Sequence, residues 1–174
     1  MFRRFPVLVS VIVTITALSA AEQVAWKQVT PTEARFSISM PGDAKESTSV
    51  RSTSTGLLQT RTISANDELA RTYIVSWTEY RSNVLGRTSA AAIFDGSRDA
   101  LLASKGARLL RESEVAIDGT PGRTIDFAEP DGRVTTVRFL VTATCFYQLM
   151  ASNVADTRQD PGRDRFFASF QLTR

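Results

Sequence analysis

Residues 133–152 read RVTTVRFLVTATCFYQLMAS, and the alternation of side chains in this stretch decides the fold. From Arg133 to Ala143, alternate positions such as Val137 and Phe139 are apolar and share one face. From Cys145 to Ser152, both faces are apolar. A period of two is the spacing of a β-strand, and a strand that is apolar on both faces is covered on both sides. The stretch therefore predicts two strands, the second of them central in a sheet.

Further alternating runs precede this stretch and predict further strands. They cover residues 36–40, 69–80, 109–117 and 123–128. The Ser- and Thr-rich residues 47–62 predict two more, exposed strands, because Thr favours strands and Gly56 lies where a hairpin turn is needed. Strands joined in such hairpins form an antiparallel sheet.

Two segments predict helices. Residues 88–105 place apolar side chains at helical spacing, with Thr88 or Ser89 as the N-cap and Gly106 as the stop. A second helix is predicted to begin near Asp160, and it presents an aromatic stripe formed by Phe166, Phe167 and Phe170. We therefore expect the α+β class, with a central antiparallel sheet of about six strands and helices on both faces.

The N-terminal residues 1–21 have the pattern of a secretory signal peptide. Arg3 and Arg4 precede an apolar run, which ends in small residues. This order predicts cleavage between Ala21 and Glu22. The alternative is an uncleaved membrane anchor, although the apolar run is slightly short for a span. We expect an exported protein, either periplasmic or secreted.

Residues 22–174 are then expected to form a single domain with one core. Loss of the two leader arginines lowers the net charge from +3 to +1, so the high isoelectric point gives no support to nucleic-acid binding. No second apolar stretch is long enough to cross a membrane, so we predict no membrane span in the mature chain.

The composition excludes several kinds of catalytic and metal site. The chain has no His and a single Cys, Cys145, so His-dependent triads and ordinary zinc or copper sites cannot be built. No phosphate-binding loop motif is present either. Cys145 lies in an apolar run and is predicted to be a buried, unreactive thiol; the alternative is a reactive one. We predict no enzymatic activity, no catalytic residue, no cofactor and no metal.

Carboxylates leave two alternatives open. Pairs of carboxylates can hydrolyse glycosides, and the candidates are Asp126 with Glu129 or Asp131, and Glu112 with Glu114. Clustered carboxylates can also bind calcium, and the candidates are Asp156, Asp160 and Asp164. Solvated strand edges explain the first set more simply, and helix capping explains Asp160.

Five aromatic residues allow either a hydrophobic core or a ligand pocket: Trp26, Tyr73, Trp77, Tyr80 and Phe94. Tyr73 and Trp77 share one face of a predicted strand, which is typical of core packing. The alternative is an apolar pocket between the sheet and a helix.

Several motifs in this order resemble the PsbP-like α/β sandwich family. They are an early Trp26, FSISMPG at 36–42, IDGTPGR at 117–123, RFLVTATCFYQLMAS at 138–152, and RFFASFQL as a last helix at 165–172. The resemblance covers most of residues 22–174, and it implies a central antiparallel sheet with helices on both faces and no enzymatic activity. It carries no functional residue to this chain, because one fold serves unrelated binding roles.

These observations predict an exported, non-enzymatic binding module whose partner is an unidentified protein or envelope component. One alternative is a carrier of a small apolar ligand, held between sheet and helix. Another is a hydrolase that uses the carboxylates.

Overall fold

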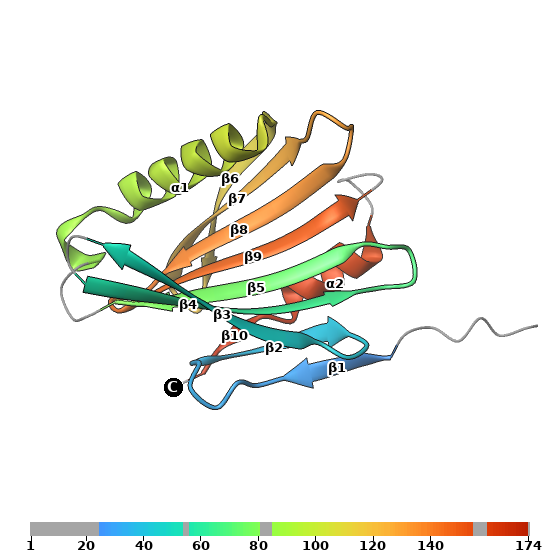
Figure 1. Cartoon of the computed structure of the whole chain (residues 1–174), viewed down its shortest axis with the longest axis horizontal. Helices are drawn as coiled ribbons and strands as arrows, with labels where there is room; N and C mark the ends of the chain where they lie inside the picture. Colours follow the sequence, from blue (N-terminus) through green and yellow to red (C-terminus); the bar gives the residue numbers. More distant parts are fainter. Residues whose placement is uncertain (1–24, 54–55, 81–84, 155–159, 174) are drawn as a thin grey trace, which may run out of the picture.

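The computed structural model describes residues 25–53, 56–80, 85–154 and 160–173. These residues form two antiparallel sheets and two α-helices, as Figure 1 shows. The α+β class predicted from the sequence is therefore confirmed. In the described residues, no helix is long and apolar enough to cross a membrane.

The larger sheet has seven strands in the spatial order β3-β4-β5-β9-β8-β7-β6. Most neighbours in this order are joined by hairpins, and β9 returns to lie between β5 and β8. The strands are β3 (Lys45–Thr53), β4 (Gly56–Asn66), β5 (Thr72–Glu79), β6 (Arg108–Ile117), β7 (Thr120–Ala128), β8 (Val134–Val141) and β9 (Cys145–Val154).

The two strands predicted from residues 133–152 are β8 and β9, and they lie near the middle of this sheet. Val137 pairs with Met150, and Leu140 pairs with Tyr147 on the opposite face. Because both faces of β9 carry large apolar side chains, both must be covered. Two different layers cover them, and they divide the core into two clusters.

Helix α1 (Ala90–Lys105) covers one side of the sheet, which we call the α1 face. A short 3-10 turn, η1 (Leu85–Arg87), leads into the helix. Ser89 caps α1 by accepting a hydrogen bond from the backbone N–H of Ala92, and Gly106 ends it with a φ of 58°. Both termini agree with the prediction. Phe94 stacks on Phe139 at 6.5 Å between ring centroids, beneath the helix.

A second layer covers the opposite side of the sheet, which we call the α2 face. This layer consists of helix α2 and a three-stranded sheet in the order β1-β2-β10 (Figure 1). Its elements are α2 (Pro161–Ala168), β1 (Trp26–Val29), β2 (Phe36–Pro41) and β10 (Gln171–Leu172).

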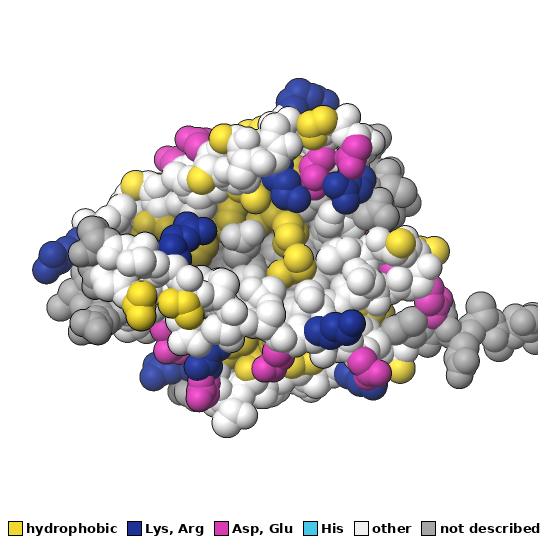
Figure 2. Space-filling model, viewed as in Figure 1, with side chains coloured by type: hydrophobic (Ala, Val, Ile, Leu, Met, Phe, Trp, Pro, Cys, Tyr) yellow, Lys and Arg dark blue, Asp and Glu magenta, His cyan; other side chains and the backbone are white. Residues whose placement is uncertain are grey.

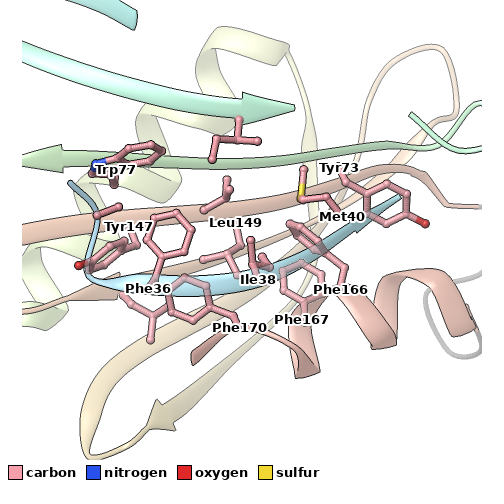
Figure 3. Close-up of a cluster of buried hydrophobic side chains, with 14 of the residues drawn as sticks. Phe36, Ile38, Met40, Tyr73, Trp77, Tyr147, Leu149, Phe166, Phe167 and Phe170 are labelled. Carbon is pink, nitrogen blue, oxygen red and sulfur yellow. The ribbon is translucent and has the colours of Figure 1, made fainter. Parts of the chain in front are cut away.

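Aromatic side chains from both layers meet in this core, as Figure 3 shows. Phe36 of β2 is fully buried; it contacts the ring of Trp77 edge-on and stacks on Phe170. Tyr73 contacts Phe166 of α2 with ring centroids 5.3 Å apart. Burial of each such side chain stabilises the fold by about 1.5–3 kcal/mol.

The structure corrects three details of the predicted fold. The larger sheet has seven strands rather than about six. Its second face is covered largely by the small sheet, with α2 beside it, rather than by helices. The last helix does not extend over 165–172, because it ends at Ala168 and the chain turns into β10, which pairs with β2. Side chains alternate every two residues in any β-strand, whether the strand belongs to the central sheet or to a second sheet packed on it. The alternation in β2 therefore predicted a strand but not the sheet to which it belongs.

Candidate functional site: a groove lined by hydroxyl groups

Helix α1 covers only part of its face of the large sheet. Its apolar side chains pack over β7 and β8, against residues such as Ile125 and Val137. Farther along the same face, β4 and β5 carry hydroxyl side chains where β7 and β8 carry apolar ones. No described element packs on this second part of the face. Its side chains therefore need not be apolar, because they do not have to fill a core.

The hydroxyl side chains form pairs across neighbouring strands. Thr60 lies opposite Thr78, and their hydroxyl oxygens are 2.8 Å apart. Thr62 lies opposite Ser76, with 2.9 Å between the hydroxyl oxygens. A hydroxyl donates one hydrogen bond and accepts two. Each pair therefore keeps spare capacity for bonds to a ligand.

These strands border a hollow of about 430 Å³, which we call the hydroxyl groove. Figure 2 shows it between α1 and the β3–β4 hairpin, with apolar side chains at its base. The lining combines hydroxyls with apolar groups and a cation: Ser49, Arg51, Thr60, Ser76, Thr78, Tyr80, Phe146 and Gln148 are among its residues. The groove can therefore offer hydrogen bonds from its walls and apolar contacts from its floor.

Tyr80 supplies a second kind of hydroxyl to the groove. Burial, and to a lesser degree the nearby Cys145, raise the pKa of the Tyr80 phenol above its ordinary value. The phenol is therefore neutral at physiological pH, and it can both donate and accept hydrogen bonds.

The five aromatic residues singled out in the sequence have different locations. Tyr73, Trp77 and Phe94 are buried in the core, and Trp26 packs at its edge, 5.3 Å from the Tyr73 ring. Tyr80 packs against the core cluster on the α1 face and also lines the hydroxyl groove. Four of the five aromatic residues thus belong to the core or its edge, and Tyr80 contributes to the candidate site.

The candidate carboxylates form ion pairs with basic residues. Asp126 is buried and accepts hydrogen bonds from Arg111 at 2.9 Å and Thr136 at 2.6 Å. Glu129 is buried too, and its carboxylate lies 3.2 Å from Arg133. Because both carboxylates are already engaged by basic side chains, a structural role explains them better than a catalytic one.

Of the other candidate carboxylates, Glu112 and Asp131 also form ion pairs. Glu112 lies 2.9 Å from Arg98 and 3.0 Å from Arg123, whereas Glu114 is exposed. Asp131 is half exposed, at a turn, and pairs with the nearby Arg133.

The carboxylates proposed for calcium are not brought together in the described residues. Asp160 caps α2 and accepts a hydrogen bond from the backbone N–H of Arg163 at 2.8 Å. Asp164 pairs with Arg163, and Asp156 lies outside the described residues. Across the described part of the chain, no group of three His, Cys, Asp or Glu side chains is arranged to hold a metal ion.

Cys145 is buried, as predicted from the sequence. It lies at the start of β9, and burial raises the pKa of its thiol to about 11. At neutral pH the thiol is therefore protonated, which agrees with an unreactive side chain. Ala21 and Glu22, at the predicted cleavage site, lie outside the described residues.

Comparison with known proteins supports the fold alone. No protein-family model matches the chain, and no curated protein matches it in sequence. Among solved structures, cyanobacterial PsbP (CyanoP) from Synechocystis sp. PCC 6803 is similar with a TM-score of 0.56 at 13% identity, covering 91% of this chain and 98% of that one.

A protein of unknown function from Pseudomonas aeruginosa, PA94, described as a putative regulator, is similar with a TM-score of 0.40 at 12% identity. That match covers 75% of this chain and 83% of the other. The likeness to cyanobacterial PsbP confirms that this chain has a PsbP-like fold.

Proposed function

We propose that this protein is an exported, non-enzymatic binding module, and that its hydroxyl groove holds an extended segment of a partner protein. The observation that carries the proposal is the groove itself: a concave, polar part of the large sheet that no described element covers. A surface of paired hydroxyls suits the N–H and C=O groups of a peptide, because each hydroxyl can donate to one and accept from the other.

The exposed edge strand β3, beside the groove, favours a partner segment in an extended conformation over a compact partner. Strand β3 is the outermost strand beside the groove, and in the described residues β4 is its one neighbour. The nine residues of β3 are almost all exposed. The outer edge of such a strand presents unpaired backbone groups, with which an added strand can pair. A peptide that enters the groove would meet this edge.

A carrier of a small apolar ligand is the second candidate. The apolar base of the groove, which includes Phe146, favours it. The two functions differ in what remains bound: native mass spectrometry of protein purified without denaturation would detect a small added mass for a carrier and none for a peptide-binding module.

Site-specific photocrosslinking in the native cell envelope tests the proposal. A photoreactive residue at Ser76, inside the groove, is expected to give a discrete protein adduct. The same residue at Ala100, exposed on α1, serves as the control. Thr60→Arg places a long charged side chain in the groove, which Thr60 lines, and should abolish the Ser76 adduct. Adducts of equal yield from both positions, or no adduct from Ser76, would contradict the proposal.

Export is tested separately by the N-terminal sequence of the protein recovered outside the cytoplasm. A chain that starts at Glu22 agrees with cleavage after Ala21. A chain that retains residues 1–21 and fractionates with membranes supports the anchor instead.

A further inference from the structure

The opposite side of the sheet carries a second pocket, which is rich in arginine. It lies on the α2 face, where α2 borders β6, β7 and β8, and its volume is about 470 Å³. Its lining includes Arg111, Arg138 and Arg163, together with the hydroxyl residues Ser113, Thr124 and Thr136. We call it the arginine pocket.

Two of the three guanidinium groups already have carboxylate partners. Arg111 lies 2.7 Å from Asp126, and Arg163 lies 2.7 Å from Asp164. Arg138 forms no ion pair with any residue in the described part of the chain. Among the described residues, no carboxylate balances the positive charge of Arg138.

Neutral groups hold the Arg138 side chain in place. Its Nε donates to the Thr124 hydroxyl at 3.1 Å, and one Nη donates to the backbone carbonyl of Phe167 at 3.3 Å. The guanidinium also stacks on the Phe167 ring, 4.8 Å from its centroid. Stacking and two hydrogen bonds fix the plane of the group before any ligand arrives.

Several N–H groups of Arg138 remain available. A guanidinium has five N–H donors, and two of them are used by Thr124 and Phe167. Within the described residues, no enclosed side-chain nitrogen or oxygen lacks a hydrogen-bond partner. The second Nη of Arg138, which makes no hydrogen bond, is therefore not fully enclosed.

An unpaired charge in this setting is costly. Burial lowers the pKa of Arg138 below its ordinary value, because partial removal of water disfavours the charged form. Arginine nevertheless stays protonated. An anion that entered the pocket would supply the missing charge and accept the unused N–H groups.

We propose that the arginine pocket binds the phosphate group of a ligand through Arg138, with Arg111 and the Ser113 and Thr136 hydroxyls nearby. The planar fork of arginine matches the oxygens of phosphate, and charge-assisted hydrogen bonds are the strong ones. The phosphate belongs either to a free small molecule or to a lipid headgroup. This pocket lies on the face opposite the hydroxyl groove, so the proposal does not depend on the function proposed for the groove.

Calorimetric titration with inorganic phosphate, at constant ionic strength, tests the pocket. We expect saturable binding to the wild-type protein and at least a tenfold weaker Kd for Arg138→Met. Arg165→Met is the matched control, because Arg165 also stacks on an aromatic ring, at 4.9 Å from Trp26, but lies outside this pocket. Its Kd should stay within twofold of wild type. Equal weakening in both variants, or no binding to wild type, would overturn the proposal.

Arg138→Lys covers the case in which the Met variant fails to fold. It keeps the charge and loses the fork, so we expect severalfold weaker binding; an unchanged Kd would count against the geometry. Glycerol 3-phosphate and vesicles of phosphatidylglycerol distinguish the two sources. Binding of the first in solution assigns a free ligand, and cosedimentation with the vesicles that Arg138→Met abolishes assigns a lipid headgroup. Failure of both would overturn the proposal.

Discussion

Arg71 and Arg138 hold opposite ends of α2, and they do so by different means. Arg71 lies beside the N-terminus of the helix, where it donates to Asp160 at 2.7 Å and to Asp67 at 2.6 Å. Arg138 lies near the other end and donates to the backbone carbonyl of Phe167. One guanidinium is thus enclosed by two carboxylates, and the other is held by neutral groups.

The pKa values of the two side chains shift in opposite directions. Burial lowers the pKa of Arg71, but its hydrogen bonds to Asp160 and Asp67 outweigh this effect and raise it. Burial alone acts on Arg138 and lowers its pKa. The comparison indicates that Arg71 stabilises the fold through its two carboxylate partners. Arg138 has no carboxylate partner among the described residues, so its charge is available to the anion proposed above. Substitutions at and around the two residues test this difference.

The largest effect is expected from Arg71→Met. Asp67 and Asp160 would be left as buried carboxylates without their shared partner, and loss of one member of a buried ion pair costs about 3 kcal/mol or more. Urea unfolding should show a lower midpoint with an unchanged slope. Arg165→Met, an exposed change on α2, should leave the midpoint close to wild type. A midpoint for Arg71→Met equal to that of the control would contradict a structural role.

Asp160→Asn should have a smaller effect that depends on pH. Burial tends to raise the pKa of Asp160, but the Arg163 backbone N–H and Arg71 lower it overall. A lowered pKa means that the ionised group stabilises the fold above its unfolded pKa of about 3.9, and that this contribution is lost as the pH falls below it. Asn keeps the capping oxygen and removes the charge, so we expect a loss of about 1.5–2 kcal/mol at pH 7 that shrinks toward pH 3.

Asp164→Asn is the control for this pH dependence, because Asp164 is largely exposed. The difference between wild type and this variant should be small at every pH. If the difference in the free energy of unfolding between wild type and Asp160→Asn stayed constant from pH 7 to pH 3, the charge on Asp160 would not contribute to holding α2 in place.

Arg138→Met should change the free energy of unfolding by no more than about 1 kcal/mol. The variant loses the stacking on Phe167, but it also removes a partly buried charge that has no carboxylate partner, and the two effects oppose each other. Thermal and urea unfolding both measure this. A loss as large as that of Arg71→Met would show that Arg138 is a structural residue, and the contrast between the two ends of α2 would disappear.

Thr124→Val should give the smallest effect, about 0.5–1 kcal/mol, because it removes a single hydrogen bond, from the Nε of Arg138 to a neutral hydroxyl, and leaves the contacts with Phe167 in place. The sharper measurement is the NMR resonance of the Arg138 Nε–H, which should move and broaden when its acceptor is lost. An unchanged resonance would mean that stacking on Phe167 alone sets the plane of the guanidinium.

The parts of the fold that follow local rules could be predicted. Ser89 and Gly106 marked the ends of α1 because capping depends on a few neighbouring residues. The alternation in β8 and β9 identified central strands. The predicted aromatic stripe near the C-terminus packs in the core. The predicted end of α2 was wrong, since pairing of β10 with β2 interrupts a helical pattern that has no local stop.

The candidate sites could be predicted only in part. Residues 47–62 were recognised as exposed strands, and they became a groove because α1 packs over β7 and β8 and leaves β4 and β5 open. The arginine pocket could not be recognised from any pattern in the sequence. Arg111, Thr124, Arg138 and Phe167 lie on four different elements, so their proximity depends on the strand order.

The sequence by itself determined the α+β class, the central pair of strands, the caps of α1 and the exclusion of His-dependent chemistry. Each depends on composition or on residues a few positions apart. Tertiary structure decided that β2 belongs to a separate layer and that the described residues leave part of one sheet face uncovered. It also decided that Arg138 meets neutral partners while Arg71 meets carboxylates. These outcomes depend on contacts between segments that lie far apart in the sequence. Local patterns do not specify which of these segments pack together, so they do not specify the contacts.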